Sequence, residues 1–332
     1  MQYRRSDYDV TNAVQVSSPA AVRGAVLELF AQQWPTAAFA QVEAAFNDFD
    51  RLFSGQFPGY LGCDTVYHDM QHTLDGVLAT SRVVVGHERS RPAREQLGPE
   101  RAALAVVIAL FHDAGYIRRQ DESAQRNGAE FTKNHVTRSA KFLAQYLPTI
   151  GMAEWAPVAT RIVHFTGYEV QFDQIKLDDP RDRLVGHIVG TGDLIAQLSD
   201  RCYLEKCRDR LYPEFVLGGI ALSQEPSGQL KVKYSSGLDV LRQTPEFFDE
   251  VFRSRLDGEF AGAYRFLEPL FGGRNPYIEA IERTLTYLRE ILETEQWPRL
   301  RRDPPCFTWE KNPLQNVRML VLGHLKNMWV KR

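Results

Sequence analysis

Hydrophobic residues recur about every three to four positions along most of the chain, and this spacing predicts an all-α protein. Ser18 and Pro19 suit the N-cap and the first turn of the first helix. A loop with proline and glycine at 55–62 leads into a helix that we expect from near Thr65 to about Gly86. Other helices are expected at about 18–34, 36–53, 100–113, 132–147, 153–165, 181–199, 201–212, 245–256, 259–271, 276–295 and 313–329.

Two segments interrupt the helical pattern. The polar stretch 89–99 contains prolines, and we expect it to form an exposed connection. The stretch 220–234 has strand character, and a turn at Pro226-Ser227-Gly228-Gln229 would close a small β-hairpin.

Composition limits the class of protein. The 332 residues are 44% hydrophobic, which is enough for a sizeable core. A net charge of −2 with scattered Lys and Arg argues against nucleic acid or an anionic membrane surface as the main partner. No segment has the ~18 uninterrupted apolar residues of a membrane helix, and the N-terminus does not have a secretory pattern. The four cysteines form no CxxC pair, so we expect reduced thiols and a cytoplasmic location.

The most informative pair of residues is His112-Asp113, which follows an apolar run over 102–111. That run has no polar face and predicts a helix buried on all sides. A carboxylate at its end loses its hydration, so it must be paired, protonated or bound to a metal ion. Adjacent helical residues diverge by about 100°, so the pair could share one metal only near a helix end. Gly115 supplies such an end.

His68, His72 and Asp193 are further candidates for the same site. His68 and His72 lie four residues apart, so on a helix they would share a face and point into one pocket. Asp193 lies in another apolar segment, next to glycines that would let a neighbouring backbone come close. Two imidazoles and two carboxylates, from His72, His112, Asp113 and Asp193, suit a divalent cation.

Two more histidines lie between the His-Asp pair and Asp193. His135 opens one expected helix, and His164 ends another. If both turned inward, they would hold a second metal with Asp113 as the bridge. Two metals that clamp the attacking and leaving oxygens are a common solution for phosphate ester hydrolysis.

Each candidate alone has a plainer explanation. A single histidine on an apolar face can be a hydrogen-bonded core residue, which is our interpretation of His87 and His187. Asp193 alone could cap a helix or form an ion pair. The ordered set is harder to explain in this way, because each buried ionisable group would need its own partner.

In this order the residues resemble the HD superfamily of metal-dependent phosphohydrolases. His72, His112-Asp113 and Asp193 match its H…HD…D signature across about 61–212. The sequence Tyr-His-Asp-Met-Gln-His at 67–72 is also similar to the YHNxxH motif of class I cyclic-nucleotide phosphodiesterases, with aspartate in place of asparagine. We therefore expect an HD-type helical core at 61–212, with an N-terminal helical extension at 1–60 and a C-terminal one at 213–332.

The two additional histidines resemble ligands of a subset of that superfamily. His135 and His164 are similar to the extra ligands of dinuclear members such as the HD-GYP cyclic-di-GMP phosphodiesterases. The GYP motif itself is absent, because Gly167-Tyr168 is followed by Glu169. The resemblance therefore implies a phosphohydrolase without naming its subfamily.

The resemblance also implies roles for individual residues. His72, His112, Asp113 and Asp193 would hold the metal, which would lower the pKa of a bound water. Asp113 would in addition orient the nucleophile, and His68 would protonate the leaving alkoxide as general acid. Mixed His and Asp ligation suits one or two ions of manganese, iron, zinc, cobalt or nickel, and magnesium less well.

Phosphate in a substrate also needs polar or cationic partners. Lys133, Arg138 and Lys206 lie near the metal motifs in sequence, and Arg138 is preferred because it is about one helical turn from His135. Gln197 is four residues beyond Asp193 and could contact a base or a metal-bound water. The plainer interpretations are solvated surface charges and, for Gln197, a core hydrogen bond.

The sequence leaves several functions open. The expected activity is hydrolysis of a small phosphorylated substrate, most directly a phosphodiester such as a cyclic nucleotide. A nucleotide phosphomonoesterase, a di-iron oxygenase of HD type and a non-catalytic, metal-stabilised regulatory module are the alternatives. The amphipathic C-terminal helices could pack within the chain or form a homodimer.

Overall fold

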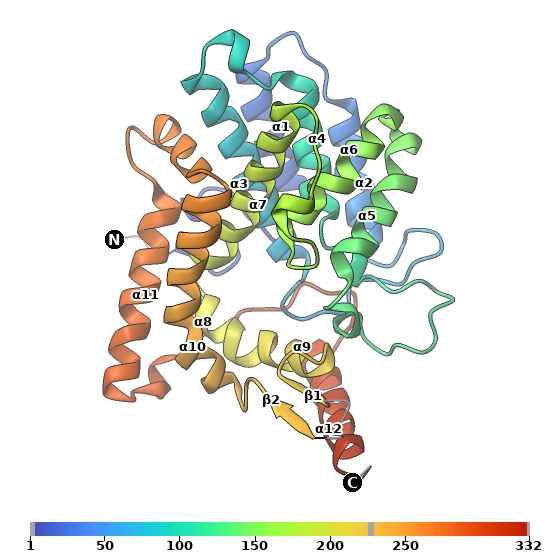
Figure 1. Cartoon of the computed structure of the whole chain (residues 1–332), viewed down its shortest axis with the longest axis vertical. Coiled ribbons are helices and arrows are strands. Elements are labelled where there is room, and N and C mark those ends of the chain that lie inside the picture. Colours follow the sequence, from blue (N-terminus) through green and yellow to red (C-terminus); the bar gives the residue numbers. More distant parts are fainter. Residues whose placement is uncertain (1–3, 225–228, 331–332) are drawn as a thin grey trace.

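The computed structural model describes residues 4–224 and 229–330 and confirms the all-α class. Within these residues there are twelve α-helices and one two-stranded sheet (Figure 1). The helices are α1 (Pro19–Gln33), α2 (Ala40–Phe53), α3 (Met70–Ser90), α4 (Gly98–Phe111), α5 (His135–Tyr146), α6 (Ala156–Ile162), α7 (Pro180–Ser199), α8 (Tyr203–Lys206), α9 (Tyr212–Leu217), α10 (Gly237–Glu250), α11 (Pro276–Thr294) and α12 (Pro313–Val330).

Helices α3 and α7 pack along each other at the centre of the molecule (Figure 1). Their close approach depends on glycine, because a Cβ on Gly192 would lie 2.1 Å from Oγ1 of Thr80 on α3. On the other side, a Cβ on Gly76 of α3 would lie 3.7 Å from the Cα of Asp193. Gly192 beside Asp193 therefore allows the close approach of another backbone, as the sequence suggested. This approach brings Asp193 against the helix that carries His72.

Helix α4 is the apolar helix expected before the His-Asp pair. Every residue from Ala102 to Phe111 is buried. The helix ends at Phe111, and His112 and Asp113 lie in the turn that follows, before a short 3₁₀ segment at Ala114–Tyr116. His112 still has helical backbone dihedrals, whereas Asp113 departs from them, so the two adjacent side chains can face one point at the end of the helix.

The start of α3 differs from the prediction. The helix begins at Met70 and not near Thr65, because the Asp69 side chain accepts the backbone N–H of His72 at 3.1 Å as an N-cap. The second oxygen of Asp69 accepts the N–H of Phe307 at 3.0 Å. His68 is therefore in the loop before the helix, and the expectation that it shares a helical face with His72 was wrong.

After α7, parts of the segments that were expected to be α-helical adopt π-helical or 3₁₀ geometry. A π-helical segment, Cys207–Leu211, joins α8 to α9, and another, Val251–Glu259, continues α10. The helix expected at 259–271 is mostly a 3₁₀ segment, Ala263–Leu270. Strands β1 (Leu222–Gln224) and β2 (Leu230–Val232) pair antiparallel and confirm the small hairpin; most of its predicted turn, 226–228, lies outside the described residues.

The C-terminal region returns to the centre of the molecule. The segment before α12 contacts the loop that precedes α3, where Trp309 donates its backbone N–H to the carbonyl of Cys63 at 3.1 Å. Phe307 accepts the N–H of Met70 at 3.2 Å. The loop that carries His68 is therefore supported by residues nearly 240 positions away. No described helix combines the length and apolarity needed to cross a bilayer.

Candidate metal centre

Four side chains from three segments converge on one point between α3, α4 and α7. His72 Nε2 lies 3.3 Å from Asp113 Oδ2 and 3.4 Å from Asp193 Oδ1. His112 Nε2 lies 3.3 Å and 3.6 Å from the same two oxygens. The four residues that the sequence assigned to one metal, His72, His112, Asp113 and Asp193, are thus brought together. We call them the ligand group.

The facing atoms of the ligand group are not used by the protein itself. His112 Nε2, Asp113 Oδ2 and Asp193 Oδ1 are buried, and none of the three has a hydrogen-bond partner. A buried polar atom without a partner is costly, and three of them at one point indicate a ligand. Ligand atoms held about 2.0–2.2 Å from a tetrahedral ion lie roughly 3.3–3.6 Å apart, so the observed separations fit a divalent cation.

Backbone carbonyls fix the histidine tautomers that a metal requires. His112 Nδ1 donates to the carbonyl of Ala109 at 2.8 Å, so Nε2 is the ring nitrogen that faces the two carboxylates. His135 Nδ1 donates in the same way to the carbonyl of Thr132 at 2.8 Å. In both residues the ring is therefore oriented by its own helix or turn, with Nε2 directed at Asp113.

The charges of His112 and Asp113 stabilise each other. Burial alone would raise the pKa of Asp113, but His112 beside it holds that pKa well below its usual value. Burial lowers the pKa of His112, yet the charges of Asp113 and Asp193 raise it far above the ordinary range. The Asp113 carboxylate thus stays ionised despite its burial and favours a positive charge beside it.

Asp113 presents its second oxygen to a different histidine. Its Oδ1 lies 3.8 Å from Nε2 of His135, while Oδ2 faces His72 and His112. A carboxylate that bridges two metals must place its oxygens in this way. His164 is not part of the ligand group; its Nδ1 is buried without a hydrogen-bond partner, and the structure brings it into neither of the two possible ligand clusters, His68–His72–Asp113 and His72–His112–Asp193.

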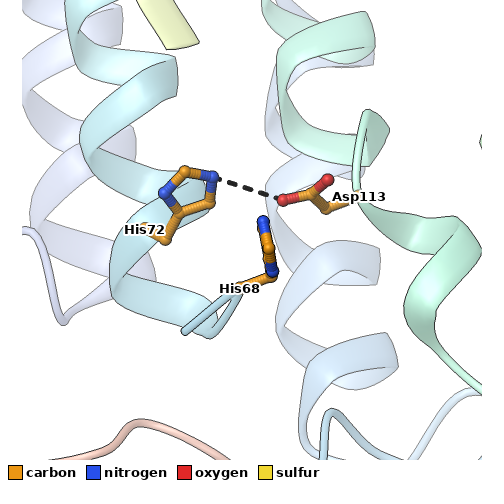
Figure 2. Close-up of side chains that lie close together, drawn as sticks. All are labelled: His68, His72 and Asp113. Atoms are coloured by element: carbon orange, nitrogen blue, oxygen red, sulfur yellow. Dashed lines mark ion pairs between the residues drawn. The ribbon is translucent and has the colours of Figure 1, made fainter. Parts of the chain in front are cut away.

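His68 lies beside the ligand group and is held by a partner that the sequence analysis missed. Figure 2 shows its ring pointing towards the gap between His72 and Asp113. Its Nδ1 bonds Oε2 of Glu214 at 2.6 Å, and Oε1 of Glu214 accepts the backbone N–H of Tyr67 at 2.6 Å. Burial lowers the pKa of His68, but the charge and hydrogen bond of Glu214 outweigh it, so the net pKa is raised.

Tyr116 links His68 to His135. Its ring stacks on His68 with 4.5 Å between the ring centroids, and on His135 with 4.3 Å. Glu169 fixes the other side of His135 by accepting the backbone N–H groups of Val136 and Thr137 at the start of α5. The two histidines outside the ligand group are therefore held in place by neighbours on several sides.

Two of the predicted substrate-binding cations are already paired. Arg138 forms a bidentate pair with both carboxylate oxygens of Glu122, at 2.6 and 2.8 Å, and it also donates to the carbonyl of Gly115 at 2.7 Å. Lys206 is buried against Asp200 and also donates to Gln71 at 3.1 Å. In this structure neither offers a free charge to a substrate, and the interpretation of Lys206 as a solvated surface charge was wrong.

The other two predicted contacts lie in different places. Lys133 is exposed beside Gly219. Gln197 is close to the ligand group, because its Oε1 accepts the hydroxyl of Tyr67 at 3.2 Å, and its side chain lines a cavity of about 10 Å³ together with His72 and Lys206. Such a cavity holds roughly one water molecule.

No family model, curated protein or solved structure matches this chain. The resemblance to the HD superfamily therefore depends on the motif residues and their spacing.

Proposed function

We propose that this protein is a metal-dependent phosphoester hydrolase of HD type. The observation that supports it best is the ligand group, in which three buried ligand atoms converge without any other partner. A metal site that only stabilises the fold would need no residues besides its ligands. Here a histidine with a raised pKa lies beside the ligands and is fixed by a buried glutamate. Ligands together with a positioned acid are what hydrolysis of an ester with a poor leaving group requires.

The donor set favours a divalent transition metal. Two imidazole nitrogens and two carboxylate oxygens suit manganese, iron, zinc, cobalt or nickel better than magnesium, which prefers oxygen ligands and bound water. We propose one ion in the ligand group, and a second between Asp113 Oδ1 and His135. Bound there, the metal would supply Lewis acidity and lower the pKa of a water molecule.

His68 is the proton donor in this proposal. Its Nδ1–H is held by Glu214, so the opposite nitrogen of the ring is available to the substrate. As the bond between phosphorus and the leaving oxygen breaks, the leaving oxygen would take the proton from Nε2 and water would add its hydroxyl group to phosphorus; the proton that the water releases would restore the imidazolium. Glu214 keeps the imidazolium charged until then and orients its ring.

We propose a small phosphorylated substrate, a phosphodiester such as a cyclic nucleotide in the first instance. Four free cysteines fit the reducing cytoplasm that the sequence suggested. A homodimer stays a prediction.

Turnover by the metal-loaded protein tests the proposal. Protein reconstituted separately with manganese, iron, zinc, cobalt and nickel is assayed on bis-p-nitrophenyl phosphate and p-nitrophenyl phosphate. Faster release from the diester supports a phosphodiesterase, and faster release from the monoester favours the phosphomonoesterase. Consumption of dioxygen by the iron form would favour an oxygenase. No turnover with any metal or ester would contradict the proposal and leave a regulatory module.

A further inference from the structure

Arg255 is a buried arginine near the metal centre that no predicted motif includes. It lies in the π-helical segment Val251–Glu259, and only 5% of its surface is exposed. Burial lowers the pKa of its guanidinium, so the position disfavours the charge that the residue carries. π-Helical turns within longer helices are frequent at functional sites, because the extra residue re-aims a side chain.

The contacts of Arg255 position its guanidinium but leave one nitrogen free. Nη2 donates to the carbonyl of Gly167. The guanidinium carbon lies over the ring of Tyr168, 3.6 Å from the ring centroid. Nη1 is buried and has no hydrogen-bond partner, and no carboxylate within ion-pair distance is found among the described residues. The charge is therefore held in place without being neutralised.

The anchors of Arg255 lie at the edge of the metal centre. A Cβ on Gly167 would lie only 2.4 Å from Cγ2 of Val136, so Gly167 packs on the residue directly after His135. The carboxylate of Asp193 is near enough to raise the pKa of Arg255 against the effect of burial. Tyr168 itself is 67% exposed. Arg255 thus contacts Gly167 and the exposed Tyr168, and through Gly167 it is joined to the helix that His135 begins.

The other cations considered for the substrate are engaged. Arg138 is neutralised by Glu122, and Lys206 by Asp200. Among the residues that the structure describes, Arg255 is the one arginine with a buried nitrogen that has no partner. A planar guanidinium with a free N–H is the group that suits a phosphate oxygen.

We propose that Nη1 of Arg255 binds a non-bridging oxygen of the substrate phosphate, and that Tyr168 and the Gly167 carbonyl hold the guanidinium in place. This inference rests on the proposed function, because it takes the anion at this site to be the phosphoester. It adds a second residue, after Glu214, that the region 213–332 would contribute to the site.

Binding of inorganic phosphate to the manganese-loaded protein, measured by calorimetry, tests the inference. Arg255→Gln removes the charge at similar length, and we expect about 10- to 100-fold weaker binding with manganese content unchanged, since a hydrogen bond to a charged group is worth about 1.5–3 kcal/mol. Arg253→Gln is the matched control, because Arg253 is exposed and paired with Glu250 in the same segment. It should bind phosphate like the parent protein.

Arg255→Lys keeps the test decisive if the glutamine variant does not fold. Lysine retains the charge but lacks the planar guanidinium, so we expect phosphate binding to weaken by an intermediate factor of about 3 to 10. Unchanged phosphate binding in a folded Arg255 variant would overturn the inference, and so would loss of manganese, which would make Arg255 a counter-charge for Asp193.

Failure of the inference and failure of the proposed function give different results. Phosphate binding that depends on Arg255, without turnover of any phosphoester, would support the anion site and contradict the proposed hydrolase function. Phosphoester turnover that Arg255→Gln leaves intact would sink the anion site alone. Absence of phosphate binding by the parent protein would contradict the anion site directly.

Discussion

The ligand group and the His68–Glu214 pair lie side by side, yet they differ in how their polar atoms are satisfied. The facing atoms of His112, Asp113 and Asp193 have no hydrogen-bond partner, although they are buried. His68 and Glu214 are instead bonded to each other at 2.6 Å, and Glu214 also accepts a backbone N–H. The first region could hold a cation, and in the second the pKa of the histidine is raised by its glutamate partner. This difference is the basis for proposing separate roles in metal binding and proton donation.

Removing the metal should have the largest effect. Treatment with a chelator, or the variant Asp193→Asn, is expected to lower turnover by about 1,000-fold or more, because Lewis-acid stabilisation contributes several kcal/mol to the transition state. The measurement is kcat on bis-p-nitrophenyl phosphate before and after chelation, with re-addition of manganese as the control. Full turnover by metal-free protein would show that the ligand group does not serve catalysis.

Removing the acid should reduce rate without removing metal. We expect His68→Ala to lower kcat on the order of 100- to 10,000-fold, since general acid catalysis contributes that much when the leaving group is an alkoxide. Metal content is measured on the same preparation and should equal that of the parent. A p-nitrophenolate leaving group needs less protonation than an alkoxide, so the decrease in kcat of His68→Ala should be smaller on a p-nitrophenyl ester. Metal loss in this variant would place His68 among the ligands.

Glu214→Gln should change the pH dependence of turnover more than its maximum. Burial lowers the pKa of His68, but the charge of Glu214 raises it above the usual value. The acid form therefore persists to higher pH than in a free histidine, and activity should fall as the pH rises through that raised pKa. Without the charge of Glu214 the pKa drops, and the alkaline limb of the kcat profile should move to lower pH. An unmoved limb would mean that another group controls it.

The smallest effect is expected for Arg138, the cation first assigned to the substrate. Arg138→Gln breaks the bidentate pair with Glu122 and the bond to Gly115, so we expect a loss of about 1–2 kcal/mol in the free energy of unfolding. Turnover and metal content should stay close to those of the parent. Denaturant titration measures the free energy of unfolding, and the diester assay measures turnover. A large rise in KM at unchanged stability would restore Arg138 as a substrate contact.

The residues of the ligand group could be predicted because the signals for them are local. The apolar run of α4 marks Asp113 as buried, and the glycines beside Asp193 indicate the close approach of another helix. Both features are visible within a few residues of the ligand and follow from desolvation and packing. The all-α class was predicted for the same reason, since the hydrophobic spacing is local.

The residues that orient the site could not be predicted in this way. Glu214 is nearly 150 positions from His68, and its one local sign is an acid next to the apolar residues Phe215, Val216 and Leu217. The helix start was misplaced because Asp69 was considered as a motif position and not as an N-cap. Arg255 has no motif, and its free nitrogen becomes visible only when Gly167 and Tyr168 are placed around it.

Metal content is the measurement that tests the central claim most directly. The parent protein, His72→Ala and His324→Ala are purified in parallel, reconstituted with manganese and zinc, and analysed by inductively coupled plasma mass spectrometry. The account predicts about one or two ions per chain in the parent and in His324→Ala, whose changed residue lies on α12, and a marked loss in His72→Ala. No bound metal in the parent after reconstitution, or equal metal in all three proteins, would contradict it.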